Sequence, residues 1–272
     1  MTSHYSDKVF SGSIPELYET YLVPLIFEHY ARDLARRLAD EPVSRVLEMA
    51  AGTGVVTRAM VDALEPSVSI VATDLNQSML DYGASVRADE NVDWRQADAL
   101  ALPFEDGTFE AVVCQFSVMF FPDRAKAYSE TLRVLKPGGR FLFNVWDHIK
   151  ENEFADTVTE SLAGVFPADP PRFLARTPHG YSDIDEVASD LGNGGFTDTP
   201  VVETIAARSK ASNPSIPAIA YCQGTPLRNE IDSRDASLLK HATDVATAAV
   251  SELFGSGAVD GKIQGHVVSI RA

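Results

Sequence analysis

The sequence predicts an α/β fold, with a doubly wound, seven-stranded, mostly parallel sheet and helical cap insertions. One reason is that five short apolar segments alternate with helical patterns between residues 44 and 146. Parallel strands need such crossovers, because a tight turn cannot return the chain to the same end of a sheet. The other reason is a loop of small residues, A-A-G-T-G at 50–54, directly after the first apolar segment. Small residues there permit a sharp turn from a strand into a helix.

The first predicted element is a helix over residues 13–40. Ser13 is a suitable cap residue, and Pro15 suits the first helical turn. Apolar residues recur at helical spacing along this segment, which predicts one buried face. Pro24 lies inside the segment and cannot donate a backbone hydrogen bond, so we expect an interruption there.

The alternating part begins at residue 44. Asn76 is a suitable cap for its second helix, and the K-P-G-G run at 136–139 ends its third, because proline and glycine stop helices. The predicted strands are 44–49, 68–73, 92–96, 109–115 and 140–146, and the predicted helices are 55–64, 76–87 and 122–135.

The alternation breaks after Asp147. The pattern then predicts, in order, a short helix and a proline-rich loop within 151–180, a helix over 182–191 that ends at glycines, a strand over 201–207, helices within 215–254 and a strand over 263–270. The two added strands would complete a sheet of seven.

The composition narrows the class of partner. The chain of 272 residues has a formal net charge of −16, so its field would repel nucleic acid and anionic membrane surfaces. No apolar run is long enough to span a bilayer, and the N-terminus lacks the apolar core of a signal peptide. Cys114 and Cys222 are too few for a disulfide framework or a cysteine metal site. We therefore expect a cytoplasmic protein.

A ribose-bearing cofactor is suggested by the run V-L-E-M-A-A-G-T-G at 46–54. Ala50, Gly52 and Gly54 let the backbone approach a ligand closely. A dinucleotide fingerprint starting at Gly52 would place Thr57 where glycine or alanine belongs. Glu48 would also oppose the charge of a pyrophosphate, whereas it suits a ligand that carries an ammonium and a sulfonium.

Polar residues follow three further predicted strands. Asp74 ends the second strand, where its carboxylate can accept hydrogen bonds from two ribose hydroxyls. Asp98 and Ala99 follow the third, where they could meet an adenine ring, although an exposed loop acid explains Asp98 equally well. Gln115 ends the apolar fourth strand and is well placed to meet a cofactor or substrate.

Together these segments resemble the Rossmann-like S-adenosylmethionine-dependent methyltransferases, in particular the small-molecule group that includes ubiquinone/menaquinone biosynthesis methyltransferases. The resemblance covers residues 44–147 and includes V-A-T-D-L-N-Q-S-M-L and L-R-V-L-K-P-G-G-R-F. It implies S-adenosylmethionine contacts at Glu48, Ala50, Gly52, Asp74, Leu75, Asp98, Ala99 and Gln115. Ala50 departs from the family's usual E/D-x-G-x-G-x-G, which has glycine there.

The resemblance also implies a domain organisation. We expect one methyltransferase domain over 1–272. Its expected parts are an N-terminal helical cap at 1–42, a cofactor-binding core at 43–150, substrate lid insertions at 151–182 and 211–256, and remaining core elements at 183–210 and 257–272. Tyr18 and Tyr21 lie in the cap, which often covers the cofactor in such enzymes, although packing against the sheet explains both equally well.

Methyl transfer from a sulfonium is an in-line displacement that depends mainly on alignment in a dry pocket. A general base is needed only where the acceptor must lose a proton. His148, just after the fifth strand, is the preferred candidate, with His179 and Tyr181 as alternatives. No histidine or carboxylate cluster has metal-ligand spacing, so we expect no metal.

Two other functions remain open at this stage. A non-catalytic protein that binds S-adenosylmethionine or its demethylated product would have the same pocket, and a nicotinamide-dependent oxidoreductase is disfavoured by Thr57 and Glu48. The fourth strand ends in C-Q-F-S rather than the N/D-P-P-Y of enzymes that methylate nucleic-acid amino groups. We therefore expect a small-molecule acceptor. Its identity, the methylated atom and the oligomeric state are not readable from the sequence.

Overall fold

A computed structural model of the protein describes residues 14–272, so the predicted cap Ser13 lies outside the described residues. The chain divides into two compact units. Within the described residues, unit 1 comprises 14–27, 146–180 and 206–264, and unit 2 comprises 28–145, 181–205 and 265–272.

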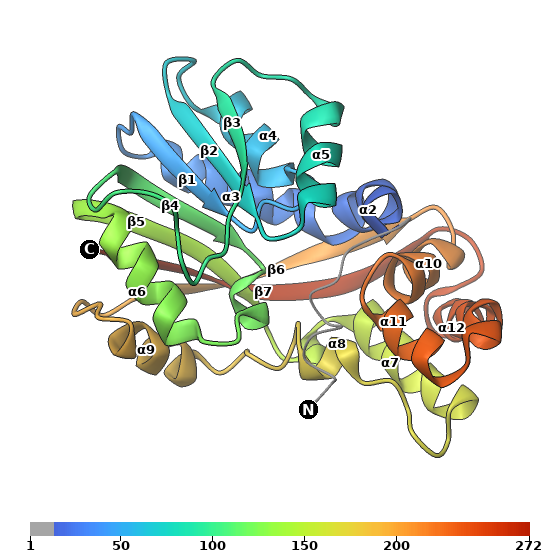
Figure 1. The fold of residues 1–272 in the computed structure, drawn as a ribbon. Helices are drawn as coiled ribbons and strands as arrows, with labels where there is room; N and C mark the ends of the chain where they lie inside the picture. Colours follow the sequence, from blue (N-terminus) through green and yellow to red (C-terminus); the bar gives the residue numbers. More distant parts are fainter. Residues whose placement is uncertain (1–13) are drawn as a thin grey trace. The chain divides into compact units, whose positions relative to one another are not determined.

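The sheet has seven strands in the order β3-β2-β1-β4-β5-β7-β6 (Figure 1). The strands are β1 (Arg45–Met49), β2 (Ser69–Asp74), β3 (Val92–Gln96), β4 (Phe109–Gln115), β5 (Leu135–Trp146), β6 (Val201–Ala211) and β7 (Val259–Arg271). The four pairings among β1 to β5 are parallel. β7 runs against β5, because Gly139 bonds to Ala272 while Asp147 bonds to Gln264. The predicted doubly wound, mostly parallel, seven-stranded sheet is confirmed.

Unit 2 holds the parallel strands between two groups of helices (Figure 1). Its helices are α3 (Glu28–Ala39), α4 (Val55–Ala63), α5 (Gln77–Val86), η2 (Val118–Phe120), α6 (Arg124–Val134) and α9 (Ile184–Asn193). On one face, apolar residues of α3 and α4 pack against β1, β2 and β4. On the other face, Tyr128 of α6 packs against Phe141 and Phe143 of β5. β1, β2, β4 and the second half of β5 are therefore buried on both sides, which explains their continuous apolar sequences, whereas β3 at the edge of the sheet is more exposed and more polar.

Unit 1 is mostly helical. Its helices are α2 (Ile14–Leu17), η1 (Tyr18–Phe27), η3 (Ile149–Glu151), α7 (Glu153–Val165), α8 (Phe173–Arg176), α10 (Ser215–Gln223), α11 (Leu227–Asp235), η4 (Ala236–Leu238) and α12 (Leu239–Phe254). Within the unit, α12 packs against both α7 and α10. Phe154 of α7 also closely contacts Gly261 of β7, where a Cβ atom would lie 3.0 Å from the ring.

The structure differs from the predicted elements at several boundaries. The helix predicted over 13–40 is divided as expected, because η1 is a π-helical segment that accommodates Pro24. α6 ends before the K-P-G-G run as predicted, yet the run belongs to β5, since Gly138 and Gly139 pair with Ala272. β6 and β7 are also longer than predicted. Such strand ends depend on partners distant in sequence, which local patterns do not report.

A bilayer-spanning segment was not expected from the sequence. Among residues 14–272, no helix combines the length and the apolar character that crossing a membrane requires.

Candidate active site

The loop after β1 turns through three left-handed residues. The φ angles are 53° at Ala50, 57° at Gly52 and 82° at Gly54. The loop is tied to β2 by the Ala51 N–H, which donates to the Thr73 carbonyl at 2.8 Å. A left-handed conformation costs a residue with a Cβ about 1–2 kcal/mol. Ala50 therefore bears backbone strain at the position where the resembling family has glycine.

Trp94 of β3 packs against this loop from the side. A Cβ atom on Gly54 would lie 2.4 Å from Cη2 of the indole, and one on Gly83 of α5 would lie 2.9 Å from the same atom. Real Cβ contacts are never this short, so both positions need glycine for the ring to lie where it does. The glycine loop, β3 and α5 are therefore held together by one tryptophan.

Glu48 is a buried acid on β1, 2% exposed. Its Oε2 accepts a hydrogen bond from the Thr57 hydroxyl at 2.5 Å. The pKa of the Glu48 carboxyl is raised to about 8, mainly by burial and to a smaller extent by the nearby Asp74 charge, whereas Thr57 and Arg58 oppose the shift. A cationic ligand near this carboxyl would favour its ionised form. Thr57 occupies the position where a dinucleotide fingerprint has glycine or alanine. In this structure its hydroxyl holds the Glu48 side chain in place.

Asp74 ends β2 and is also buried, 7% exposed. Its Oδ2 accepts the Gly52 N–H at 2.9 Å, and its Oδ1 accepts the Asn76 N–H at 2.8 Å. Burial raises the pKa of this carboxyl, while these backbone donors oppose the shift. The side chain of Asn76 donates a third, longer bond. The Leu75 N–H is a fourth donor to this carboxylate, so a ligand hydroxyl would share or replace one of these bonds.

The two acids lie at the ends of neighbouring strands and contact the same loop and helix start. Glu48 bonds to Thr57 in the first turn of α4, and Asp74 bonds to Gly52 in the loop that precedes it. Sequence reasoning placed Asp74 at a ribose and missed its bond to the glycine loop. The D-x-N spacing at 74–76 signals only the local bond to Asn76, whereas the bond to Gly52 joins residues 22 positions apart and has no local signal.

Asp98 is exposed, and its Oδ1 accepts the N–H of Leu100 within its own turn at 2.9 Å. Ala99 lies in this turn, which an isolated bridge between Asp98 and Ala101 closes. Leu75 is an exposed apolar residue directly after Asp74, with 48% of its surface accessible. Its side chain offers an apolar surface beside a carboxylate, which suits a nucleoside.

Gln115 ends β4 and is 9% exposed. Its buried Oε1 has no hydrogen-bond partner among the described residues, and the same is true of the Thr53 hydroxyl in the glycine loop. Buried polar atoms without partners are uncommon because they cost free energy. Two of them at the ends of β1 and β4 indicate a place for a polar ligand.

The remaining predicted site residues belong to unit 1. Tyr18 stacks on Phe27 with ring centroids 5.2 Å apart, and Tyr21 is partly exposed. His148 is exposed at the start of η3, where its Nδ1 accepts the Lys150 N–H at 3.3 Å. The predicted residues of unit 2 lie at or just after the carboxyl ends of β1 to β4, and a hydrogen bond joins Gly52 to Asp74; the set is Glu48, Ala50, Gly52, Asp74, Leu75, Asp98, Ala99 and Gln115.

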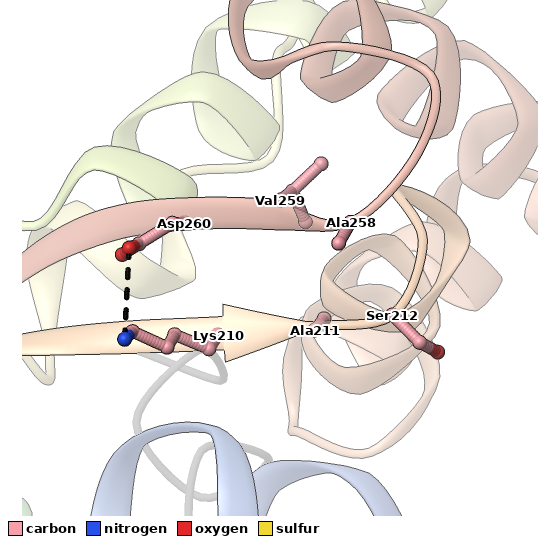
Figure 2. A pocket seen from close by; sticks show the side chains of 6 residues that line it. All are labelled: Lys210, Ala211, Ser212, Ala258, Val259 and Asp260. Atoms are coloured by element: carbon pink, nitrogen blue, oxygen red, sulfur yellow. Dashed lines mark ion pairs between the residues drawn. The ribbon is translucent and has the colours of Figure 1, made fainter.

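Unit 1 contains a pocket whose lining residues include none of the predicted site residues. It is lined by Lys210, Ala211, Ser212, Ala258, Val259 and Asp260 (Figure 2). Lys210 and Asp260 face each other across it at 3.9 Å. The pocket offers an ion pair, a serine hydroxyl and small apolar side chains.

Comparison with known proteins decides the family. The profile of the methyltransferase domain matches residues 47–143. The chain is 34% identical over 166 residues to demethylmenaquinone methyltransferase of Renibacterium salmoninarum, covering 58% of this chain and 68% of that protein. It is 30% identical over 168 residues to the ubiquinone/menaquinone biosynthesis C-methyltransferase UbiE of Saccharophagus degradans, covering 57% and 68%. The chain belongs to this family of S-adenosylmethionine-dependent methyltransferases. It is therefore an enzyme that methylates a small molecule.

Solved structures share the fold of this methyltransferase. An S-adenosylmethionine-dependent methyltransferase from Thermotoga maritima aligns with a TM-score of 0.55 at 15% identity, covering 100% of this chain and 99% of that one. A methyltransferase structure from Bacillus halodurans aligns with a TM-score of 0.56 at 18% identity, covering 88% and 97%. At these identities the likeness concerns the fold alone.

The crowding of Gly54 by Trp94 gives a first prediction. Gly54→Ala should lower the free energy of unfolding by about 2–4 kcal/mol, from left-handed strain and a clash with the indole. Gly107→Ala is the matched control, because Gly107 has a φ of 61° and nothing within 4 Å of its added Cβ. It should cost only about 1 kcal/mol. Urea denaturation measures both, and equal losses would show that Trp94 does not constrain the loop.

The raised pKa of Glu48 gives a second prediction. Because it rises from 4.5 to about 8, the stabilising contribution of this group is fully present below pH 4.5 and is lost as the pH rises toward 8. Glu48→Gln removes that loss. The variant should therefore gain stability over wild type between pH 5 and pH 8, by roughly 2–4 kcal/mol.

Urea denaturation at the two pH values measures this difference. Glu65→Gln is the control, because Glu65 is exposed. If the stability of Glu48→Gln relative to wild type did not change with pH, Glu48 would not be held in its neutral form.

Proposed function

We propose that this methyltransferase holds S-adenosylmethionine at the carboxyl ends of β1 to β4 and methylates a hydroxylated aromatic ring. The observation that carries the cofactor site is the buried carboxyl of Glu48, hydrogen-bonded to Thr57 and close to the charge of Asp74. A buried acid held neutral by its surroundings suits a ligand with positive charge, because that charge repays the cost of ionisation.

The proposed contacts divide the cofactor among the strand ends. Glu48 and Gln115 would face the methionine part, since it carries an ammonium and a carboxylate. Asp74 would accept from the ribose hydroxyls, and Leu75 would lie against the adenine. Ala50 and Gly52 would allow close approach of the backbone, and Asp98 and Ala99 would meet the adenine edge. Tyr18 and Tyr21 of η1 belong to unit 1, and their contact with the cofactor stays a prediction.

S-adenosylmethionine supplies the methyl group and the leaving sulfur when bound. The residues of this chain bind and orient the two reactants and keep water away from them. Because in-line displacement tolerates little misalignment, the rigid strand ends are suited to this work. The buried Gln115 Oε1 and Thr53 hydroxyl are polar groups that a bound ligand would satisfy.

The acceptor class comes from the relatives. One of the relatives named above is a demethylmenaquinone methyltransferase by its name, and the other is a C-methyltransferase of ubiquinone/menaquinone biosynthesis. Quinones are rings that carry oxygen substituents. The profile match ends at residue 143, before the segments 151–182 and 211–256 that we propose as the substrate lid of a single domain. Those segments would select the acceptor.

We also propose that the enzyme acts in the cytoplasm.

A general base would be needed for a ring that must lose a proton. His148 is the proposed base, but its Nδ1 accepts the Lys150 N–H, so the neutral ring carries its proton on Nε2. His179 has the opposite tautomer, because its Nδ1–H donates to the Asp147 carbonyl at 2.9 Å. Its Nε2 therefore has a lone pair, although burial lowers the pKa of His179 to about 4. Tyr181 is a poor base, because burial raises its pKa.

The cofactor site is tested by calorimetric titration with S-adenosylhomocysteine. Asp74→Asn keeps the shape of the side chain and removes its charge, so binding should weaken by about 1–3 kcal/mol. Asp81→Asn on α5 is the control, because Asp81 is exposed and bonds to Gln77. Wild-type enzyme that binds no cofactor, or an Asp74→Asn variant that binds normally, would disprove this site.

The acceptor class is tested by comparing turnover of reduced quinones with turnover of a panel of amines.

The pH dependence of turnover distinguishes His148 from His179 as the general base. If His148 is the base, His148→Gln should lower kcat about 100-fold and remove the acidic limb of the pH profile, whereas His179→Gln should leave the limb in place. The reverse result would transfer the role to His179. Unchanged profiles for both variants would mean that the reaction needs no histidine base.

A further inference from the structure

β4 leaves the sheet through a strained residue. Phe116, directly after Gln115, has a φ of 46°, a left-handed conformation that is a true outlier for a bulky side chain. Its ring is 4% exposed and packs edge-on against Tyr30, with centroids 4.9 Å apart. Strain of this kind persists only where the surroundings hold it, and it gathers at functional sites.

Asn144 of β5 holds this strained turn. The Phe116 N–H donates both to the carbonyl of Asn144 and to its side-chain Oδ1, at 3.1 Å in each case. Asn144 is 0% exposed and lies in register with Gln115 on the neighbouring strand. Since Oδ1 accepts from Phe116, the orientation of the amide is assigned, and Nδ2 is directed elsewhere.

Two buried amide atoms near this turn lack partners. Nδ2 of Asn144 and Oε1 of Gln115 have no hydrogen-bond partner among residues 14–272. An asparagine that only supported the fold would be expected to satisfy both ends of its amide, because an unpaired buried donor destabilises the folded state.

Both side chains share one face of the sheet with Glu48. Val46, Val113 and Leu142 belong to the apolar core against α3 and α4. Side chains alternate along a strand, so the residues two positions later lie on that same face. These residues are Glu48, Gln115 and Asn144. Asn144 Nδ2 and Gln115 Oε1, the unpaired donor and acceptor, therefore lie on the same face of the sheet as Glu48, at the polar end of that face.

We propose that Asn144 is a positioning residue that fixes Gln115 for the ligand by holding the left-handed turn at Phe116. The proposal rests on the proposed function, in which Gln115 contacts the cofactor. Removing the Asn144 amide would release the bond from the Phe116 N–H to Oδ1, and Gln115 would then sample directions unsuited to the ligand. The substitution would therefore lower the affinity for the cofactor, and it would do so only because Gln115 is no longer held in position.

A double-mutant cycle on the affinity for S-adenosylhomocysteine tests this route, with folding checked by circular dichroism. Asn144→Leu should weaken binding about tenfold in the wild-type background, comparable to the loss of one good hydrogen bond. In the Gln115→Ala background the same change should have almost no further effect, because its target is already absent. Equal effects of Asn144→Leu in both backgrounds would overturn the proposal.

Asn144→Asp is the second variant, for use if leucine prevents folding. At pH 6 a buried aspartic acid would stay protonated, so its carbonyl oxygen can accept from Phe116 and its hydroxyl can replace Nδ2–H. Binding should stay within about threefold of wild type. A loss as large as that of Gln115→Ala would contradict a positioning role. If Gln115→Ala itself binds normally, the assignment of Gln115 fails, and the role of Asn144 fails with it.

Discussion

The hydrogen bond from the Gly52 N–H to the buried carboxylate of Asp74 is the interaction on which the site depends. It joins the loop after β1 to the end of β2, so the two strand ends keep one arrangement. The same carboxylate also accepts the N–H of Asn76, the residue that precedes α5. One side chain therefore contacts the loop, the end of a strand and the start of a helix.

The strained and unsatisfied groups of unit 2 gather at this edge of the sheet. Ala50 and Phe116 are its two left-handed residues with a Cβ among those described, Glu48 has a raised pKa, and Gln115 has an unpaired buried oxygen. Each lowers stability, and the apolar core against α3 and α4 offsets that cost. A protein retains such features where a ligand uses them.

The predicted cofactor residues and the candidate histidines are divided unevenly between the two units. The predicted cofactor residues, except Tyr18 and Tyr21, belong to unit 2, whose alternating segment matches the methyltransferase profile. Unit 1 is assembled from three separate segments of sequence and contains both candidate histidines, His148 and His179.

The sequence alone determined the strands of the parallel sheet, the glycine loop and the acids that end β1 and β2, because periodicity and turn chemistry are written in neighbouring residues. It did not reveal the indole of Trp94 between Gly54 and Gly83, nor Asn144 beneath Phe116. These contacts join residues far apart in the chain. Strand register, burial and the satisfaction of polar atoms arise only when distant segments pack, so the tertiary structure decided them.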